Sequence, residues 1–340
     1  MAAMAVSAIA GEQAEIMRAA VRARWGKPEK VVEIEDVSKP KLEDDTVLVR
    51  VKAVSVNRAD YYMTVAPGIL LRPMIGGFLK PKMRQLGTDF AGVVEAVGKS
   101  VSGYQPGDEV FGAKTPAFCE FVAARMFVHK PANVSFEEAA AVPVSALTAL
   151  QALRDHGKLE AGQRALVNGA SGAVGTYAVQ VAKALGASTV TAVCSPRNVE
   201  QARRLGADRV VDYTKEDFTR SGDRYDVIVD IGGTHPWRHL RRVLTPNGTL
   251  VMVGSQRRNN PLIGPLGYIF RTALASRLSK QKATFFIAKF NKPDMETLRE
   301  LLESGKIKSV IERVYPFPEI ADALQYMGEG HARANLVVTF

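Results

Sequence analysis

Three glycines at a regular spacing give the clearest chemical signal in this sequence. The apolar run Arg164–Asn168 is predicted to be a strand, it leads into Gly169, Gly172 and Gly175, and a helical pattern follows. In such a unit the first glycine permits a sharp turn, the second lets a pyrophosphate approach the backbone, and the third lets the helix pack on the strand. N–H groups at the helix start attract phosphate. We therefore predict a dinucleotide-binding turn, rather than a glycine-rich turn without a ligand, formed by Gly169, Ala170, Ser171, Gly172, Ala173, Val174 and Gly175.

The residues after the next predicted strand indicate which dinucleotide binds. NAD sites place an acid about 20 residues beyond the glycines, on the ribose hydroxyls. Here the strand Thr189–Cys194 is followed by Ser195, Pro196 and Arg197, with no acid. Serine and arginine can both bond a 2′-phosphate, which a carboxylate would repel. The pattern favours NADP(H); the alternative is that Arg197 is a solvated charge at the start of a helix.

Two types of element must position these residues. Before Pro131, short β-like runs at residues 18–56 and 89–130 are separated by closely spaced glycines, a pattern typical of a small β-barrel. After Pro131, apolar strands alternate with helices, which indicates a parallel sheet covered on both faces. The predicted strands are Ala165–Asn168, Thr189–Cys194, Val210–Val211, Asp226–Asp230, Thr249–Gly254 and Thr284–Ala288, and the tail adds Ile311–Tyr315 and Leu336–Phe340.

The positive charge of the chain is concentrated in a few segments. The 340 residues, enough for two domains, carry a net charge of +10, but residues 231–293 contain eleven Lys and Arg and no acid, so the rest sums to −1. A second acid-free stretch lies between Asp60 and Asp89. A generally nucleic-acid-binding surface is therefore not expected. Two cysteines exclude a disulfide scaffold, no apolar run of membrane-spanning length occurs, and the N-terminus lacks a targeting pattern, so a cytoplasmic protein is expected.

Several blocks resemble the zinc-independent quinone oxidoreductases, the zeta-crystallin-like branch of the medium-chain dehydrogenase/reductase superfamily. The resemblance spans about residues 17–340, and the blocks that carry it are 86–98, 104–112, 139–153, 165–187 and 205–213. It implies an α/β protein with a GroES-like β-barrel catalytic domain and a Rossmann domain, a doubly wound parallel sheet, with the active site in the cleft between them. The implied boundaries are 1–16 for an N-terminal extension, 17–138 and 290–340 for the catalytic domain, and 139–289 for the NADP-binding domain. The edge strand Thr284–Ala288 implies a homodimer.

The resemblance also indicates that the chain uses no metal. Zinc alcohol dehydrogenases of the superfamily carry a catalytic cysteine, a Gly-His-Glu motif and a later cysteine. The matching positions here hold Asn57, the run Gly87-Thr88-Asp89, and Val144. Asn, Thr and Val cannot form a zinc-thiolate/imidazole site. Hydride transfer to an acceptor that is already electrophilic is therefore the expected chemistry.

The resemblance places catalytic candidates on one short segment. Tyr62 matches an active-site tyrosine that could donate a hydrogen bond or a proton to a carbonyl oxygen, or could simply line the cleft. Asn57 could orient nicotinamide or substrate, or serve as a turn residue. Asp60 could bond ribose, water or Arg58, or have a structural role. Further implied cofactor contacts are Thr148, Tyr213, Gly232, Gly254, Ser255, Arg333 and Asn335, although the family's lysine is absent beside Arg333.

The sequence therefore predicts an NADPH-dependent reductase of quinones or α,β-unsaturated carbonyl compounds, including enones, enals and enoyl thioesters. One alternative is a pathway-specific nicotinamide-dependent enzyme for another redox or cyclisation step. Another is a nicotinamide-binding protein without turnover, structural or RNA-binding. The segments 63–85 and 256–282 mix aliphatic and basic residues. They are expected to form loops over an apolar or anionic substrate, or else an amphipathic surface or dimer contact.

Overall fold

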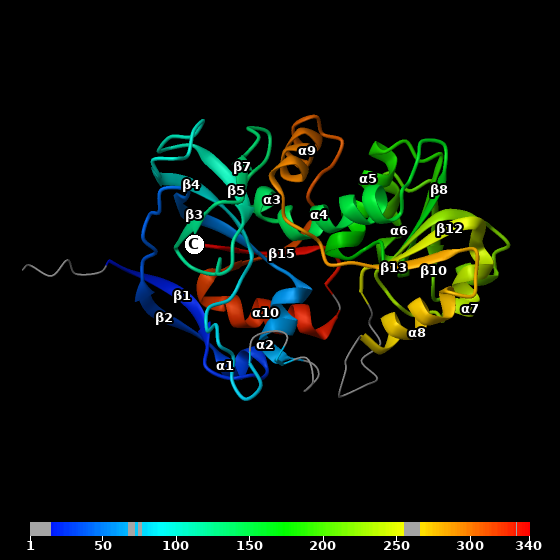
Figure 1. Ribbon diagram of the computed structural model, residues 1–340, viewed down its shortest axis with the longest axis horizontal. Coiled ribbons are helices and arrows are strands. Elements are labelled where there is room, and N and C mark those ends of the chain that lie inside the picture. The colour runs from blue at the N-terminus through cyan, green and yellow to red at the C-terminus, as the bar shows by residue number, and fades with distance from the viewer. Residues whose placement is uncertain (1–14, 67–71, 74–76, 255–265, 331) are drawn as a thin grey trace, which may run out of the picture.

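The described chain builds two large sheets and a separate two-stranded sheet, with helices around them, as the computed structural model in Figure 1 shows. The structure describes residues 15–66, 72–73, 77–254, 266–330 and 332–340. A mostly antiparallel sheet lies at one end of the molecule and a parallel sheet at the other. The predicted α/β class, a GroES-like unit with a Rossmann unit, is confirmed; the domain boundaries given above stay predictions.

The antiparallel part, called the β unit below, combines strands from both ends of the chain. Strand β1 (Ile16–Arg22) pairs with β2 (Val32–Ser38), and Ile16, assigned above to the N-terminal extension, therefore belongs to a strand. The larger sheet has the order β14-β15-β3-β4-β5-β7, with β6 also on β3. Its members are β3 (Val47–Val56), β4 (Asp89–Val97), β5 (Glu109–Ala113), β6 (Phe121–Ala124), β7 (Phe127–His129), β14 (Ile311–Pro316) and β15 (Asn335–Thr339).

Glycines in this sheet allow backbones to approach closely. A Cβ on Gly92 would lie 2.2 Å from the carbonyl oxygen of Arg50, and one on Gly112 would lie 2.1 Å from that of Met126. Both distances are far inside van der Waals contact, so only glycine fits. The high glycine density read from the sequence therefore reflects close strand packing in the β unit.

The parallel sheet has the nucleotide-binding strand order. Its sequence of strands is β10-β9-β8-β11-β12-β13, the classic 3-2-1-4-5-6 arrangement. The strands are β8 (Arg164–Asn168), β9 (Thr189–Cys194), β10 (Arg209–Asp212), β11 (Tyr225–Asp230), β12 (Leu244–Met252) and β13 (Lys282–Phe285). The associated helices are α5 (Ala173–Ala184), α6 (Val199–Arg204), α7 (Trp237–Leu240) and α8 (Leu266–Ser276). The carboxyl ends of these strands form the edge at which cofactors bind.

Three described helices of at least eight residues were not predicted from the sequence. They are α2 (Arg58–Val65), α8, and α10 (Ile320–Glu329). Since α8 lies within segment 256–282, the expectation of a loop there is wrong for residues 266–276. The predicted strand Thr284–Ala288 also ends too late, because β13 stops at Phe285. A short helix, α1 (Pro28–Val31), completes the β unit.

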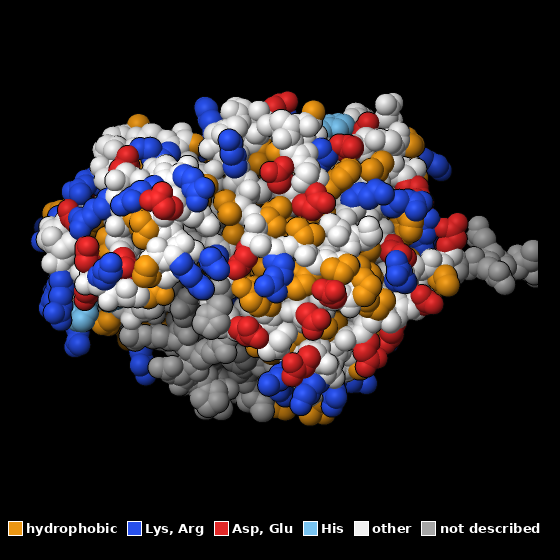
Figure 2. Space-filling model, turned by 180° about the vertical axis from the view of Figure 1, so that it is seen from behind, with side chains coloured by type: hydrophobic (Ala, Val, Ile, Leu, Met, Phe, Trp, Pro, Cys, Tyr) orange, Lys and Arg blue, Asp and Glu red, His pale blue; other side chains and the backbone are white. Residues whose placement is uncertain are grey.

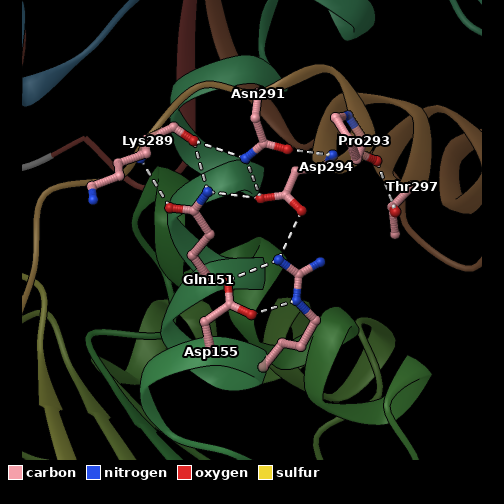
Figure 3. A network of polar contacts seen from close by, with 8 residues as sticks. Gln151, Asp155, Lys289, Asn291, Pro293, Asp294 and Thr297 are labelled. Carbon is pink, nitrogen blue, oxygen red and sulfur yellow. Dashed lines mark hydrogen bonds and ion pairs between the residues drawn. The ribbon is translucent and has the colours of Figure 1, made fainter.

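The chain passes between the two sheets twice, and polar contacts join the two passages. The first passage includes α3 (Phe136–Ala140) and α4 (Pro143–Gln151), and the second leads into α9 (Lys292–Glu303). Figure 3 shows Gln151 pointing from the end of α4 toward the second passage, where its amide donates to the Lys289 carbonyl (2.8 Å) and to Asp294 (2.7 Å). Arg154 also donates to Asp294, at 2.7 Å. The two connections are therefore fastened side by side.

The helices of the described segments are too short or too polar to cross a membrane.

Candidate active site

The glycine turn has the geometry that a phosphate needs. Gly169 turns the chain after β8 with φ +92°, a conformation that L side chains rarely adopt. Gly172 is the N-cap of α5 and supplies no side-chain cap. The only atom near a Cβ on Gly172 would be the Gly169 carbonyl oxygen, 3.8 Å away, so the space beside it is open. This helix start therefore leaves its N–H groups available to a ligand, and the residues present fit a dinucleotide.

Replacing Gly175 with alanine should weaken NADPH binding at least tenfold. An alanine Cβ would lie 2.1 Å from the Gly169 carbonyl oxygen and 2.7 Å from the Ala170 Cα, so the turn must move away from α5. Overpacking of this kind costs about 1–3 kcal/mol. Titration of NADPH fluorescence measures the change, and Gly103→Ala, which strains a backbone at φ +80° without any clash, is the control for a destabilised chain with an intact turn. Equal affinity in Gly175→Ala and wild type would contradict the assigned turn.

Three predicted cofactor residues come together at the ends of the next two strands. In the parallel pairing of β10 with β9, Asp212 lies opposite Cys194, and the Tyr213 N–H donates to the Cys194 carbonyl (3.2 Å). Tyr213 is thereby held beside Ser195, whose hydroxyl accepts from Asn198 (2.8 Å). The Tyr213 side chain is 60% exposed, and Arg197 is exposed as well. The rim predicted for a ribose phosphate is therefore open to solvent.

A buried carboxylate, missed in the sequence, shapes the turn after β11. Asp230 is fully buried and accepts hydrogen bonds from the Asn168 amide (2.7 Å) and the Gly233 N–H (2.9 Å), and from the Tyr268 hydroxyl of α8. Burial raises the pKa of Asp230. Gly232 and Gly254 follow β11 and β12 at the same edge, as predicted, whereas Ser255 lies outside the described residues. Asp230 thus ties the ends of β8 and β11 to α8.

A second buried network joins the β unit to α4. The Asn57 backbone N–H donates to Asp60 (2.8 Å), and its side-chain amide donates to Asp89 (2.9 Å). The Asn57 amide oxygen accepts from Ser145 (3.3 Å), and Asp89 also accepts from the Val144 N–H (3.1 Å). All four polar side chains are at most 5% exposed. The network therefore joins Asn57, Asp89 and Val144, which belong to the three stretches that match the metal-binding motifs of the zinc enzymes.

Burial raises the pKa of the carboxyl groups of Asp60 and Asp89. Loss of solvation raises the pKa of Asp60 to about 7, against the bonds from Asn57 and Thr88 that favour the charged form. Loss of solvation also raises the pKa of Asp89 well above its usual value, and the nearby Asp60 adds to the effect. Asp89 was not among the predicted site residues, because only the folded chain brings it to Asn57.

Tyr62 and Thr148 lie on helices that start at this network. Tyr62 is half-buried on α2, and its ring centroid is 6.1 Å from that of Tyr61, which packs against Gly328 of α10. Thr148 is half-buried on α4, where its hydroxyl donates to the Val144 carbonyl (2.6 Å). Since α4 packs against α5, the Asn57 network reaches from the catalytic candidates to the glycine-turn helix.

The C-terminal candidates have structural contacts. Arg333 is exposed and lies 3.6 Å from Glu312, while its carbonyl accepts from Gln201 of α6 (3.3 Å). It is thereby placed beside the helix that follows Arg197. Asn335 is fully buried, and its amide donates to the Val310 carbonyl (2.9 Å). The structure therefore gives Asn335 a supporting position in β15, closed to direct contact with a ligand.

Within the described segments, no group of three or more His, Cys, Asp or Glu side chains is arranged to hold a metal ion. Zinc independence stays a prediction.

Comparisons with known proteins cover both sheets. Residues 43–152 match the family described as "Alcohol dehydrogenase GroES-like domain", and residues 205–338 match "Zinc-binding dehydrogenase". The Mus musculus protein "NAD(P)H oxidoreductase RTN4IP1, mitochondrial" is 34% identical over 95% of this chain and 89% of its own. The "2-methylene-furan-3-one reductase" of Solanum lycopersicum is 31% identical over 89% of this chain and 74% of its own length. The solved structure of the quinone oxidoreductase from Coxiella burnetii superposes with a TM-score of 0.81 at 27% identity, over 96% of this chain and 100% of that one.

Proposed function

Because this chain belongs to the quinone oxidoreductase branch of the medium-chain dehydrogenase/reductase superfamily, we propose that it is an NADPH-dependent, zinc-independent reductase of quinones or α,β-unsaturated carbonyl compounds. The family makes it an NAD(P)H oxidoreductase. This disfavours the alternative of a nicotinamide-binding protein without turnover. The preference for NADPH, the acceptor class and the absence of zinc are the parts that we propose.

One observation supports NADPH most directly. Ser195 and Arg197 follow β9 where an NAD site would hold an acid, and the backbone of Tyr213 is bonded beside them. A 2′-phosphate at this rim would meet a hydroxyl and a guanidinium, both good partners for phosphate oxygens. Thr148, Gly232, Gly254 and Arg333 are proposed as further contacts along the same edge.

The acceptor would lie near α2. When bound, the reduced nicotinamide supplies a hydride to the acceptor. The Tyr62 hydroxyl is proposed to donate a hydrogen bond to the acceptor's carbonyl oxygen, which gains negative charge during the reaction. Asn57 is held by Asp60, Asp89 and Ser145, so its amide has a fixed orientation. The names of two relatives, a quinone oxidoreductase and a furanone reductase, support an electrophilic acceptor of this kind.

NADPH oxidation followed by stopped flow tests the proposal. The acceptors are a quinone, an enone and an enoyl-CoA, each before and after the enzyme is treated with a zinc chelator. Oxidation with at least one acceptor, unchanged by the chelator, is expected. Tight NADPH binding without oxidation by any acceptor would favour the pathway-specific alternative, and loss of activity with the chelator would contradict zinc independence.

Replacing Arg197 with alanine should raise the Michaelis constant for NADPH about tenfold or more and leave that for NADH unchanged. A charge-assisted hydrogen bond to phosphate is worth about 1.5–3 kcal/mol. Steady-state kinetics with both cofactors measure the split. Arg204→Ala, which removes an equal charge from the exposed side of α6, is the control. Equal losses with NADPH and NADH in Arg197→Ala would contradict the phosphate pocket.

Two further properties remain proposals. A homodimer would form through β13, which is one of the two edge strands of the parallel sheet. The cytoplasm is the proposed compartment, although the mouse relative is named mitochondrial. Light scattering of the purified protein and cell fractionation test these two points.

A further inference from the structure

The outward face of α8 carries apolar side chains that nothing described covers. Phe270 and Leu274 are each 66% exposed, and Leu278, in the turn that continues α8, is 94% exposed. Backbone bonds from Arg277 to Leu274 and from Ser279 to Ser276 extend the helical path through this turn. Residues four apart share one face of a helix, so these side chains form a stripe.

The opposite face of α8 is anchored to the protein. Tyr268, Ile269 and Thr272 are at most 9% exposed, and the Tyr268 hydroxyl donates to the buried Asp230. The helix is therefore held by its inner face, and the apolar stripe is a fixed feature of the surface rather than a result of loose packing. It begins beside the carboxyl edge of the parallel sheet, because Asp230 ends β11.

The stripe runs into a basic groove at the amino ends of β11, β12 and β13, opposite the carboxyl ends at which the cofactor is expected. A hollow of about 540 Å³ is lined by Leu278 together with Arg224, Arg241, Arg242 and Lys280. Asp223, which precedes Arg224 in the sequence, is already paired with Arg164 and Arg209. Among the described residues, no carboxylate forms an ion pair with the four cations of the groove. Figure 2 shows Lys and Arg side chains gathered at the left end of the view, where the parallel sheet lies.

The charge of this region limits what can bind it. Residues 231–293 hold eleven Lys and Arg and no acid. A second copy bound face to face at the groove would set Arg224, Arg241, Arg242 and Lys280 against the same four cations, which like charges oppose; the dimer proposed through β13 uses the strand edge instead. A nucleic acid would match the charge but leave Phe270, Leu274 and Leu278 without an apolar partner. An anionic bilayer satisfies both features, because lipid phosphates meet the cations while the apolar side chains enter the acyl boundary.

We propose that α8 and the basic groove form a docking surface for an anionic lipid membrane. In this arrangement α8 lies parallel to the membrane surface and does not span the bilayer. The start of α8 lies at the cofactor edge, so docking holds that edge near the lipid. If the proposed function is right, a quinone dissolved in the bilayer would be close to the site; the docking itself does not rest on that function.

Vesicle flotation of the full-length protein tests the proposal. Vesicles of phosphatidylcholine and phosphatidylserine in equal parts should carry the protein, and vesicles of phosphatidylcholine alone should not. Arg241→Ala with Arg242→Ala should weaken binding about thirtyfold, since each cation contributes about fivefold. Leu274→Ser with Leu278→Ser should weaken it about tenfold. Raising the salt concentration should weaken it further.

Matched variants on other surfaces serve as controls. Lys99→Ala with Lys306→Ala removes two exposed charges, and Ile16→Ser removes an apolar side chain that is 68% exposed. Both should bind vesicles like wild type, and all variants should keep the wild-type melting temperature. The proposal fails if both vesicle types bind equally or if neither binds. It also fails if the leucine variant converts a dimer to a monomer without affecting vesicle binding, or if the arginine pair governs binding to an RNA homopolymer while vesicles are ignored.

Discussion

The variant Tyr62→Phe should lose about a hundredfold in kcat with an enone or quinone acceptor and keep its affinity for NADPH. The substitution removes only the hydroxyl, which is the proposed donor to the acceptor oxygen. Loss of one donor to a developing oxyanion typically costs about 10²–10³ in rate. Single-turnover stopped-flow oxidation of bound NADPH measures the chemical step without contributions from product release.

The neighbouring tyrosine provides a matched control for that variant. Tyr61 lies on the same helix, with its ring 6.1 Å from that of Tyr62, but its ring packs on Gly328 of α10. Tyr61→Phe should retain the wild-type rate. A wild-type rate in Tyr62→Phe would mean that Tyr62 only lines the site, and that the proton or hydrogen bond comes from elsewhere.

The variant Asp60→Asn should unfold at higher denaturant than wild type at pH 8, with the two proteins nearly equal near pH 4. The folded protein holds the pKa of Asp60 at about 7, above its ordinary 3.8. Between these values the folded state binds more protons than the unfolded state, so this group's contribution to stability falls as the pH rises. Over the whole interval the loss is about 4 kcal/mol. Asparagine avoids it and can still accept the Asn57 N–H.

The comparison is made between proteins at each pH, because other groups titrate in the same range. Asp322→Asn, at an exposed acid on α10, should run parallel to wild type. If the free energies of unfolding of Asp60→Asn and wild type differ by the same amount from pH 4 to pH 8, Asp60 does not bury a charge on folding.

Local signals in the sequence were sufficient for the cofactor edge. The strand, the glycine turn and its helix lie within residues 164–185. At Gly169 and Gly175 the turn requires a residue without a side chain, so the residue type alone predicts the local geometry. The alternation of strands and helices also predicted a parallel sheet. These features depend on contacts between neighbours in the chain, which is why the pattern predicts them.

Two of the missed helices left signals in the sequence that were not interpreted as helical. Asn57 and Asp60 form the capping box that starts α2, yet they were interpreted as chemical, turn or structural residues and not as the start of a helix. In α10, Ile320, Ala323, Leu324 and Met327 are buried at helical spacing. By contrast, α8 has an apolar face turned outward, so its pattern gives no indication of which side is buried.

The role of Asp89 could not be predicted from neighbouring residues. Its partners Asn57 and Val144 are 32 and 55 positions away, and nothing in the local sequence connects them. The same holds for Asp230 and Tyr268, 38 positions apart. Buried carboxylates of this kind become visible only when the fold places their donors.

The pairing of β15 with β3 affects how the protein is made. Leu336 lies opposite Val56 and Thr339 opposite Ala53, with the whole parallel sheet between them in the chain. During synthesis the Ala53–Val56 edge therefore stays without this partner until β15 leaves the ribosome, after the whole parallel sheet has emerged. An uncovered strand edge pairs readily with other chains. Deletion of β15 should therefore produce aggregation in newly made protein, although this strand lies outside the glycine turn and the Asn57 network.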